Sequence, residues 1–172
     1  MKITIRPEEH SDFEPVRALN ILAFNRTDEA NLIDRIRDEK EYLPALSFVA
    51  VFETKIIGHI MLSKITIGVH SEGLVALAPM AVLPDFQNQN IGSQLVVHAI
   101  AEAKKAGLSA IVVLGHPNYY PKFGFVRASL KGITCPYEGV PDESFLVNEL
   151  YDNSLEGISG MATYSPAFTT EP

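Results

Sequence analysis

Residues 81–97 constrain the fold of this 172-residue chain more than any other segment, because they join a strand to a helix through a polar turn. An apolar strand ends near residue 83, and a helix with apolar residues at helical spacing begins near residue 91. The next apolar run, 109–114, is nearly continuous, which is typical of a strand buried on both faces. Strand, helix and buried strand together predict a parallel crossover within one sheet.

The turn at residues 87–92 predicts an anion site. It reads Gln-Asn-Gln-Asn-Ile-Gly and carries almost no bulky side chain. Backbone N–H groups at a helix start have no intrahelical acceptor, and the helix dipole makes that end partly positive. A strand, a slim turn and a helix N-terminus therefore favour a bound phosphate, and we expect the pyrophosphate of a coenzyme there.

The remaining hydrophobic pattern predicts a mixed α/β fold. Helical periodicity predicts two helices between residues 12 and 38, the first capped by Ser11 or Asp12. Pro79 lies inside a predicted strand, where it marks an edge, a bulge or a place where that strand leaves its neighbour. The order of elements predicts an antiparallel meander with one parallel crossover. Strands are expected at 2–6, 46–52, 56–67, 74–83 and 109–114, from about residue 125, and twice within 145–162.

Composition limits the function classes. The length predicts one domain spanning residues 1–172. A formal net charge of −7 argues against a general nucleic-acid binder, which needs a basic face. The single cysteine, Cys135, excludes a disulfide within the chain and suits a reducing compartment. No apolar run reaches membrane-spanning length and the N-terminus lacks a signal-peptide pattern, so we expect a cytoplasmic protein without a membrane partner.

Two segments resemble the motifs of one enzyme superfamily. Residues 87–92 resemble the (Arg/Gln)-x-x-Gly-x-(Gly/Ala) signature of GCN5-related N-acetyltransferases (GNAT). Residues 120–125, Tyr-Pro-Lys-Phe-Gly-Phe, resemble the late Tyr-x-x-x-Gly-Phe of that superfamily, and the intervening helix and buried strand match as well. Residues 77–82 and 115–125 further resemble the bacterial YhbS-like group of predicted N-acetyltransferases. The resemblance extends from about residue 3 to the tail.

The resemblance implies the GNAT fold. This is a mixed α/β fold with a central, mostly antiparallel sheet of about seven strands, splayed at the cofactor site and flanked by about four helices. Two residues depart from the motifs. Asn90 stands where the family usually has Gly, yet Asn is the other residue that best tolerates a left-handed backbone. His116 stands where the YhbS-like group often has Asp, so this chain lacks that carboxylate.

Acetyl-CoA is the co-substrate that the resemblance implies. Its pyrophosphate would lie on the backbone N–H groups of residues 89–93, with further hydrogen bonds from the side chains of Asn88 and Ser93. Its pantetheine arm would pair with the strand that contains Pro79, and one N–H there would polarise the thioester carbonyl. Without the second motif, a polar connection that binds nothing would be the better interpretation of the turn. The implied cofactor-binding residues are Met80, Ala81, Val82, Gln87, Asn88, Gln89, Asn90, Ile91, Gly92, Ser93 and Tyr120.

Tyr120 is the catalytic residue that the resemblance implies. It matches the family tyrosine near the CoA sulfur, which can protonate the leaving thiolate when an amine attacks the thioester directly. The alternative is that Tyr120 is an aromatic side chain packed on the sheet. The adjacent Tyr119 suits that packing role better.

The general base stays open at this point. Asp28 and Glu29 lie between the first two helices, where the family builds its acceptor wall, although helix capping explains them equally well. His116 lies in the loop before Tyr120, Glu72 in a hairpin turn suits a solvated role, and a water relay needs no base at all. Asp28, Glu29 and His116 are the candidate substrate-binding residues. The histidines show no metal spacing, so we expect no metal.

A second class of function is a non-catalytic acyl-CoA-binding sensor or interaction module that kept the cofactor site and lost the chemistry. The presence of Tyr120 favours the enzyme. A nucleotide-binding α/β protein is disfavoured, because the chain has no Gly-x-x-x-x-Gly-Lys-(Ser/Thr) segment. The acceptor is expected to be a small-molecule or peptide amine, and the strand character of the tail allows a homodimer.

Overall fold

The structure, a computed structural model, describes residues 1–169. The chain divides into two compact units. The first unit comprises Met1–Ser63, Ala78–Ala99 and the segment from Ala167 onward, and the second comprises Lys64–Leu77 and Ile100–Pro166. Strands β3 and β4 and helix α3 contribute residues to both units.

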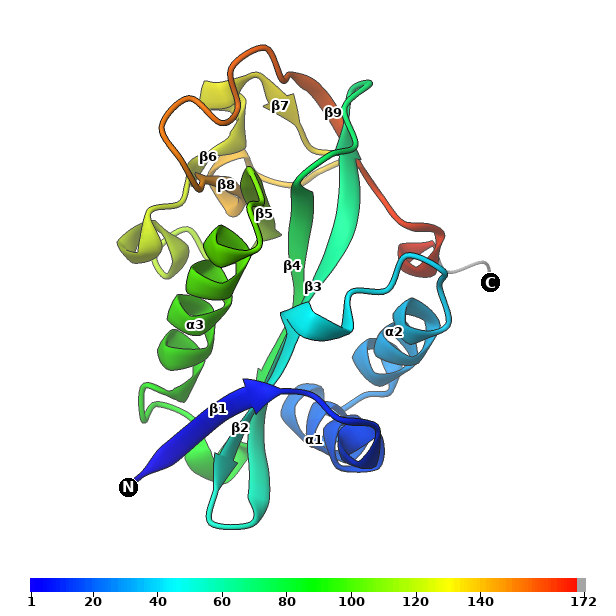
Figure 1. Cartoon of the computed structure of the whole chain (residues 1–172), viewed down its shortest axis with the longest axis vertical. Helices are drawn as coiled ribbons and strands as arrows, with labels where there is room; N and C mark the ends of the chain where they lie inside the picture. The colour runs from blue at the N-terminus through cyan, green and yellow to red at the C-terminus, as the bar shows by residue number, and fades with distance from the viewer. Residues whose placement is uncertain (170–172) are drawn as a thin grey trace. The chain divides into compact units, whose positions relative to one another are not determined.

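The described residues form nine strands and three α-helices, which confirms the mixed α/β fold (Figure 1). Neighbouring strands follow the order β1-β2-β3-β4-β5-β8-β6, and β9 pairs with both β3 and β7. The strands are β1 (Ile3–Pro7), β2 (Ser47–Phe52), β3 (Lys55–Ile67), β4 (Leu74–Val82), β5 (Ala110–Leu114), β6 (Val126–Arg127), β7 (Ile133–Thr134), β8 (Phe145–Glu149) and β9 (Gly160–Tyr164). The helices are α1 (Phe13–Phe24), α2 (Asp28–Arg37) and α3 (Ile91–Lys105), and the 3₁₀ turns that concern the site are η3 (Pro84–Phe86) and η4 (Tyr120–Phe123).

In the first unit, α1 and α2 lie side by side and share an apolar cluster with β2 and β3 (Figure 1). Each buried aliphatic side chain of this kind stabilises the fold by roughly 1.5–3 kcal/mol, so the cluster fixes both helices against the strands. Its buried members are Val16, Ile33, Ile36, Val49, Met61 and Ala167.

In the second unit, β5 is the central strand of its neighbourhood. It pairs in parallel with the start of β4, where the register joins Leu74–Ala76 to Ala110–Val112. It pairs antiparallel with β8 along its whole length. The parallel crossover predicted from the strand, helix and buried strand is therefore confirmed. A second parallel pair, β7 with β9, was not predicted.

The first unit contains a largely buried polar cluster, here called the Glu8 cluster. Its members are Glu8, Arg37, Tyr42, Ser47 and His59, of which Tyr42 is half-buried. The carboxylate of Glu8 pairs with the guanidinium of Arg37. Ser47 Oγ donates to Glu8 Oε2 at 2.8 Å and lies 3.1 Å from His59 Nε2, and the Tyr42 hydroxyl donates to the same carboxylate at 3.3 Å. Burial lowers the pKa of His59 from 6.5 to about 3, and the charge of Arg37 makes a smaller contribution in the same direction. The Glu8 cluster therefore buries one ion pair and a neutral histidine.

The observed elements differ from the predicted ones in number and in one cap. There are nine strands in the described chain rather than about seven, because β6 and β7 are two-residue strands. There are three α-helices in that part rather than about four, because the helix after β5 is only the 3₁₀ turn η4. Asp12 precedes α1 as predicted but makes no side-chain cap, because its carboxylate binds Arg6 at 2.6 Å and the backbone N–H of Glu9 at 2.8 Å. None of the helices within residues 1–169 has the length and apolar character needed to cross a membrane.

Candidate functional site

The turn before α3 has the backbone conformation that its sequence predicts. Asn90, immediately before the helix, has a φ of 66°, in the left-handed region. The expectation that this Asn adopts a shape usually given to Gly is therefore confirmed. Asn88 has a φ of 59°, a second left-handed residue that the sequence analysis did not predict. The preference of Asn for this region was the available signal.

Side-chain amides brace the turn from within. Gln87 Nε2 donates to the carbonyl of Val82 at 3.0 Å, and Gln89 Nε2 donates to the carbonyl of Asp85 at 3.0 Å. Both bonds link the turn to residues that precede it, so they hold its backbone in place. The hydrogen bond from Gln94 N–H to the carbonyl of Asn90, at 3.1 Å, belongs to the first turn of α3. Backbone N–H groups at the start of a helix generally have no acceptor within the helix, so this end of α3 favours an anion.

The start of α3 approaches β3 closely because Gly58 has no side chain. A Cβ at Gly58 would lie 2.9 Å from Leu95 Cδ1 and 3.2 Å from Ile91 Cγ2. Ile91 and Leu95 are both buried, so the first turns of α3 are packed against this strand. An isolated glycine inside a strand often marks such a close approach. The packing fixes the helix N-terminus, and with it the turn.

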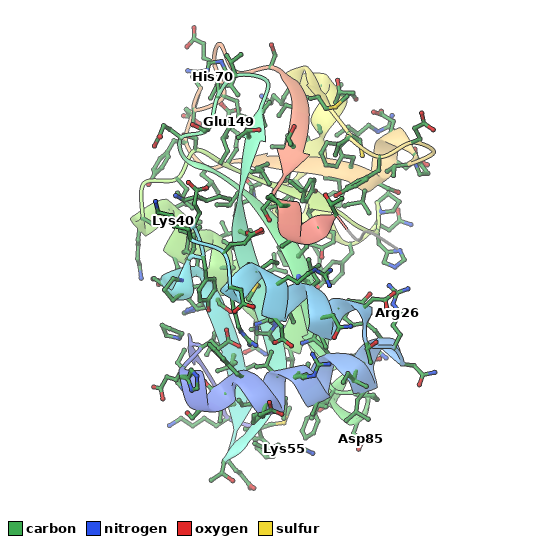
Figure 2. The ribbon with its side chains drawn as sticks, turned by 90° about the vertical axis from the view of Figure 1, so that its right-hand side faces the viewer. Arg26, Lys40, Lys55, His70, Asp85 and Glu149 are labelled. Carbon is green, nitrogen blue, oxygen red and sulfur yellow. The ribbon has the colours of Figure 1, made fainter. Side chains whose placement is uncertain are left out.

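Two oppositely charged residues, Lys55 and Asp85, lie near the turn. Lys55 Nζ is 5.7 Å from the centroid of the Phe86 ring in η3. Lys55 and Asp85 lie at the same end of the first unit (Figure 2). The positive charge of Lys55 therefore lies beside η3, which itself carries the negative charge of Asp85.

The end of β4 leads into the turn. Met80 and Val82 are half-buried and Ala81 is buried, the alternation expected of a strand. Pro79 lies in this strand and its peptide bond with Ala78 is cis. Met80–Val82 lie beyond the part of β4 that the parallel register covers, which ends at Ala76.

In the second unit, Tyr120 begins η4 and is buried. Its ring makes T-shaped contacts with the rings of Tyr119, at a centroid distance of 5.0 Å, and Phe125, at 5.5 Å. Burial raises the pKa of Tyr120 well above its usual value, and the neighbouring Tyr119 makes a smaller contribution in the same direction. The hydroxyl is therefore protonated at neutral pH, as a proton donor must be.

The prediction that Tyr119 is the packing residue of the pair is wrong. Tyr119 is half-buried and lies under Lys122, whose Nζ is 4.2 Å from the ring centroid, whereas Tyr120 is only 7 % exposed. His116 is exposed, and its carbonyl accepts the N–H of Tyr119 at 3.1 Å. His116 and Tyr120 thus belong to one short segment, whose backbone the His116 carbonyl helps to hold.

Asp28 and Glu29 start α2 in the first unit. Arg26 precedes them at the connection between α1 and α2 (Figure 2) and pairs with the Glu29 carboxylate. Burial raises the pKa of Glu29, but the hydrogen bond and charge of Arg26 outweigh it and hold that pKa below its usual value. Asp28 is exposed. Glu29 is thus a paired anion, better suited to binding a cation than to removing a proton.

Comparison with known proteins decides the family. The profile of the Acetyltransferase (GNAT) family matches residues 10–125, which include the turn before α3 and Tyr120. The chain belongs to the GNAT acetyltransferase family. The resemblance seen in its two motifs is therefore confirmed.

Bacterial relatives of this GNAT protein match most of its length. YjhQ of Escherichia coli K12, named an uncharacterized N-acetyltransferase, is 34% identical over 143 residues, which is 81% of this chain and 78% of YjhQ. YhbS of the same strain, also named an uncharacterized N-acetyltransferase, is 30% identical over 165 residues, which is 95% of this chain and 97% of YhbS. The predicted likeness to the YhbS-like group is confirmed.

Two solved structures support the same fold and hold the expected coenzyme. Crystalline Escherichia coli YhbS in complex with CoA matches with a TM-score of 0.92 and 28% identity, over 98% of this GNAT chain and 92% of that one. A GNAT acetyltransferase from Brucella melitensis in complex with acetyl-CoA matches with a TM-score of 0.80 and 27% identity, over 98% and 99% of the two chains. Within residues 1–169 of this GNAT protein, no group of His, Cys, Asp or Glu is arranged to hold a metal ion.

Proposed function

We propose that this GNAT protein is an acetyl-CoA-dependent N-acetyltransferase that acetylates a primary amine, with residues 1–172 as a single acetyltransferase domain. The observation that carries the proposal is the left-handed backbone of Asn90, at a φ of 66°. That residue lies immediately before α3, where the N–H groups of a helix start favour an anion. The CoA and acetyl-CoA complexes of the two structural relatives support the same ligand.

The turn and the end of β4 are proposed to bind acetyl-CoA. The N–H groups of residues 89–93 receive the pyrophosphate, and the side chains of Asn88 and Ser93 add hydrogen bonds. The amides of Gln87 and Gln89 keep the turn in shape through their bonds to backbone carbonyls. Residues 80–82 pair with the pantetheine arm, and the N–H of Met80 or Ala81 polarises the thioester carbonyl.

Tyr120 is proposed as the general acid. The amine nitrogen attacks the thioester carbon, the C–S bond breaks, and the Tyr120 hydroxyl gives its proton to the departing thiolate. The amine proton passes to water, and the phenolate regains a proton from solvent. Because burial keeps the hydroxyl of Tyr120 protonated in the resting protein, the proton is in place before the amine attacks.

The acceptor is proposed to be an amine that Asp28, Glu29 or His116 helps to bind as its cation, and that gives a proton to water before the neutral nitrogen attacks. The paired carboxylate of Glu29 argues against its use as general base, because a lowered pKa makes it a weak one. A water relay therefore suits the reaction better than a dedicated base.

Ligand-dependent stability tests the cofactor proposal. At about 100 times its Kd, a ligand that binds only the folded protein stabilises it by about 2.7 kcal/mol. We expect the melting temperature to rise with acetyl-CoA and CoA, and not with ATP or NAD. An unchanged melting temperature with acetyl-CoA would overturn the proposal.

Thiol release from acetyl-CoA with a panel of amines and peptides then tests the chemistry. Tyr120→Phe should lower kcat by about a hundredfold or more with little change in acetyl-CoA affinity, because a positioned acid contributes that much. Tyr119→Phe is the matched control and should keep kcat. Equal turnover in Tyr120→Phe and the native protein would remove Tyr120 from the mechanism. Binding of acetyl-CoA without thiol release for any amine would favour the sensor instead.

A further inference from the structure

Tyr120 is held within the second unit by two residues, Gly115 and Asn148, to which the mechanism above gives no role. We propose that Gly115 and Asn148 are positioning residues that set where the Tyr120 hydroxyl lies. This inference rests on the proposed role of Tyr120 as general acid.

Gly115 makes room for the Tyr120 ring. A Cβ at Gly115 would overlap Tyr120 Cε2 and would lie 2.9 Å from Cδ2 and 3.3 Å from Cζ. Real Cβ atoms do not approach other heavy atoms so closely, so the ring has to move if any side chain is present there. Gly115 does not have a left-handed φ, so an alanine there meets no backbone obstacle. Gly115 is therefore needed to make room for the Tyr120 ring, and not to allow an unusual backbone conformation.

A backbone hydrogen bond holds Gly115 in place beneath the Tyr120 ring. Gly115 immediately follows the last residue of β5, and its N–H donates to the carbonyl of Ser144 at 2.9 Å. Leu114 is paired with Phe145 in the same register. The face on which the Tyr120 ring rests is therefore an extension of the β5–β8 pair.

Asn148 holds the other end of η4. It lies in β8, opposite Ile111 of β5, and is only 6 % exposed. Its Nδ2 donates to the carbonyl of Phe123, the last residue of η4, at 3.0 Å. A buried amide is costly unless it is hydrogen-bonded, so this bond accounts for an Asn that follows Phe-Leu-Val in the strand.

The chain leaves η4 through a residue that fits against the same amide. Gly124 has a φ of 97°, and a Cβ there would lie 3.5 Å from Asn148 Nδ2. The Gly124 N–H donates to the carbonyl of Pro121 at 3.1 Å, which closes the turn. Thus η4 is packed at its first residue through Gly115 and hydrogen-bonded at its last through Asn148. Because both ends of η4 are fixed in this way, we infer that the phenol of Tyr120 has little freedom to change its position.

A double-mutant cycle with Tyr120→Phe tests whether these residues position the Tyr120 hydroxyl or only stabilise the folded protein. Gly115→Ala and Asn148→Leu are each made in the native protein and in Tyr120→Phe. Thiol release is measured with the amine that gives the fastest rate in the panel, and also with water as acceptor. In the native background each change should lower kcat by about tenfold or more, because small displacements of a catalytic group have large effects, while the KM for acetyl-CoA changes less than about twofold.

In the Tyr120→Phe background the same changes should have no further effect on kcat, since the hydroxyl they position is gone. Equal losses of kcat in both backgrounds would overturn the positioning role and leave only a structural one. If Tyr120→Phe alone keeps native kcat, the general-acid proposal fails, and this inference fails with it. Far-UV circular dichroism and thermal unfolding confirm that each variant is folded. If Asn148→Leu or Gly115→Ala does not fold, Asn148→Ser removes the Phe123 hydrogen bond with less bulk and is put through the same cycle.

Discussion

Replacing His59 with glutamine should remove part of the acid sensitivity of this protein. His59 is fully buried in the Glu8 cluster, and burial followed by the charge of Arg37 lowers its pKa from 6.5 to about 3. Glu8 Oε1 lies 3.7 Å from His59 Nε2, but that carboxylate is already paired with Arg37, so it does not restore the affinity of the ring for a proton.

The sign and size follow from proton linkage. Between about pH 6.5 and 3, His59 binds a proton in the unfolded chain but not in the folded one, so its contribution to stability is complete above pH 6.5 and is lost as the pH falls. Each pH unit in that window is worth about 1.4 kcal/mol, so the loss is about 2 kcal/mol by pH 5. Glutamine does not titrate, and the variant should lack this loss.

Urea unfolding at about pH 7.5, 6 and 5 measures the effect. The free energy of unfolding of the native protein should fall by about 2 kcal/mol more than that of His59→Gln over this range. Asp12, Glu29 and Glu149, whose pKa values are also lowered in the folded protein, destabilise both proteins alike in acid, so the difference isolates His59. The same pH slope in both proteins would refute the reasoning.

Two further substitutions test the turn and the helix behind it. Asn90→Val should lower the free energy of unfolding by about 1–2 kcal/mol in urea titration, because a β-branched residue is disfavoured at a φ of 66°, whereas Asn90→Gly should keep native stability. An unperturbed Asn90→Val would show that the turn relaxes freely. Gly58→Val should cost about 1–3 kcal/mol, because even its Cβ would lie only 2.9 Å from Leu95 and 3.2 Å from Ile91, and it should reduce the rise in melting temperature with acetyl-CoA. Normal stabilisation by acetyl-CoA in that variant would show that the packing at Gly58 does not affect the binding of acetyl-CoA.

Much of the fold was predictable because local sequence patterns determine it. The apolar run at β5, the helical periodicity of α3 and the Asn at position 90 each carry their structure within a few residues. The parallel crossover follows from their order alone. The two-residue strand β7 was missed because it pairs with Gly160 and Met161, a partner that no local pattern in β7 reveals.

The site was less predictable where it depends on distant residues. Which of Tyr119 and Tyr120 is buried depends on the space above Gly115, and the sequence alone does not show that contact. Ser11 or Asp12 was expected to cap α1, but the carboxylate of Asp12 binds Arg6 and the Glu9 N–H instead. The Glu8 cluster joins residues up to 51 positions apart in the sequence, from Glu8 to His59, so no motif could have indicated it.

The amides of Gln87 and Gln89 have a consequence for how tightly an anion can bind. Because they tie the turn to the carbonyls of Val82 and Asp85, the turn loses its conformational freedom when the protein folds rather than when a phosphate arrives. In the proposed complex, affinity for the pyrophosphate then depends on two side-chain amides that bind carbonyls of the protein itself. Shortening either glutamine should leave every N–H of the turn in the chain and still raise the Kd, through a less favourable entropy of binding.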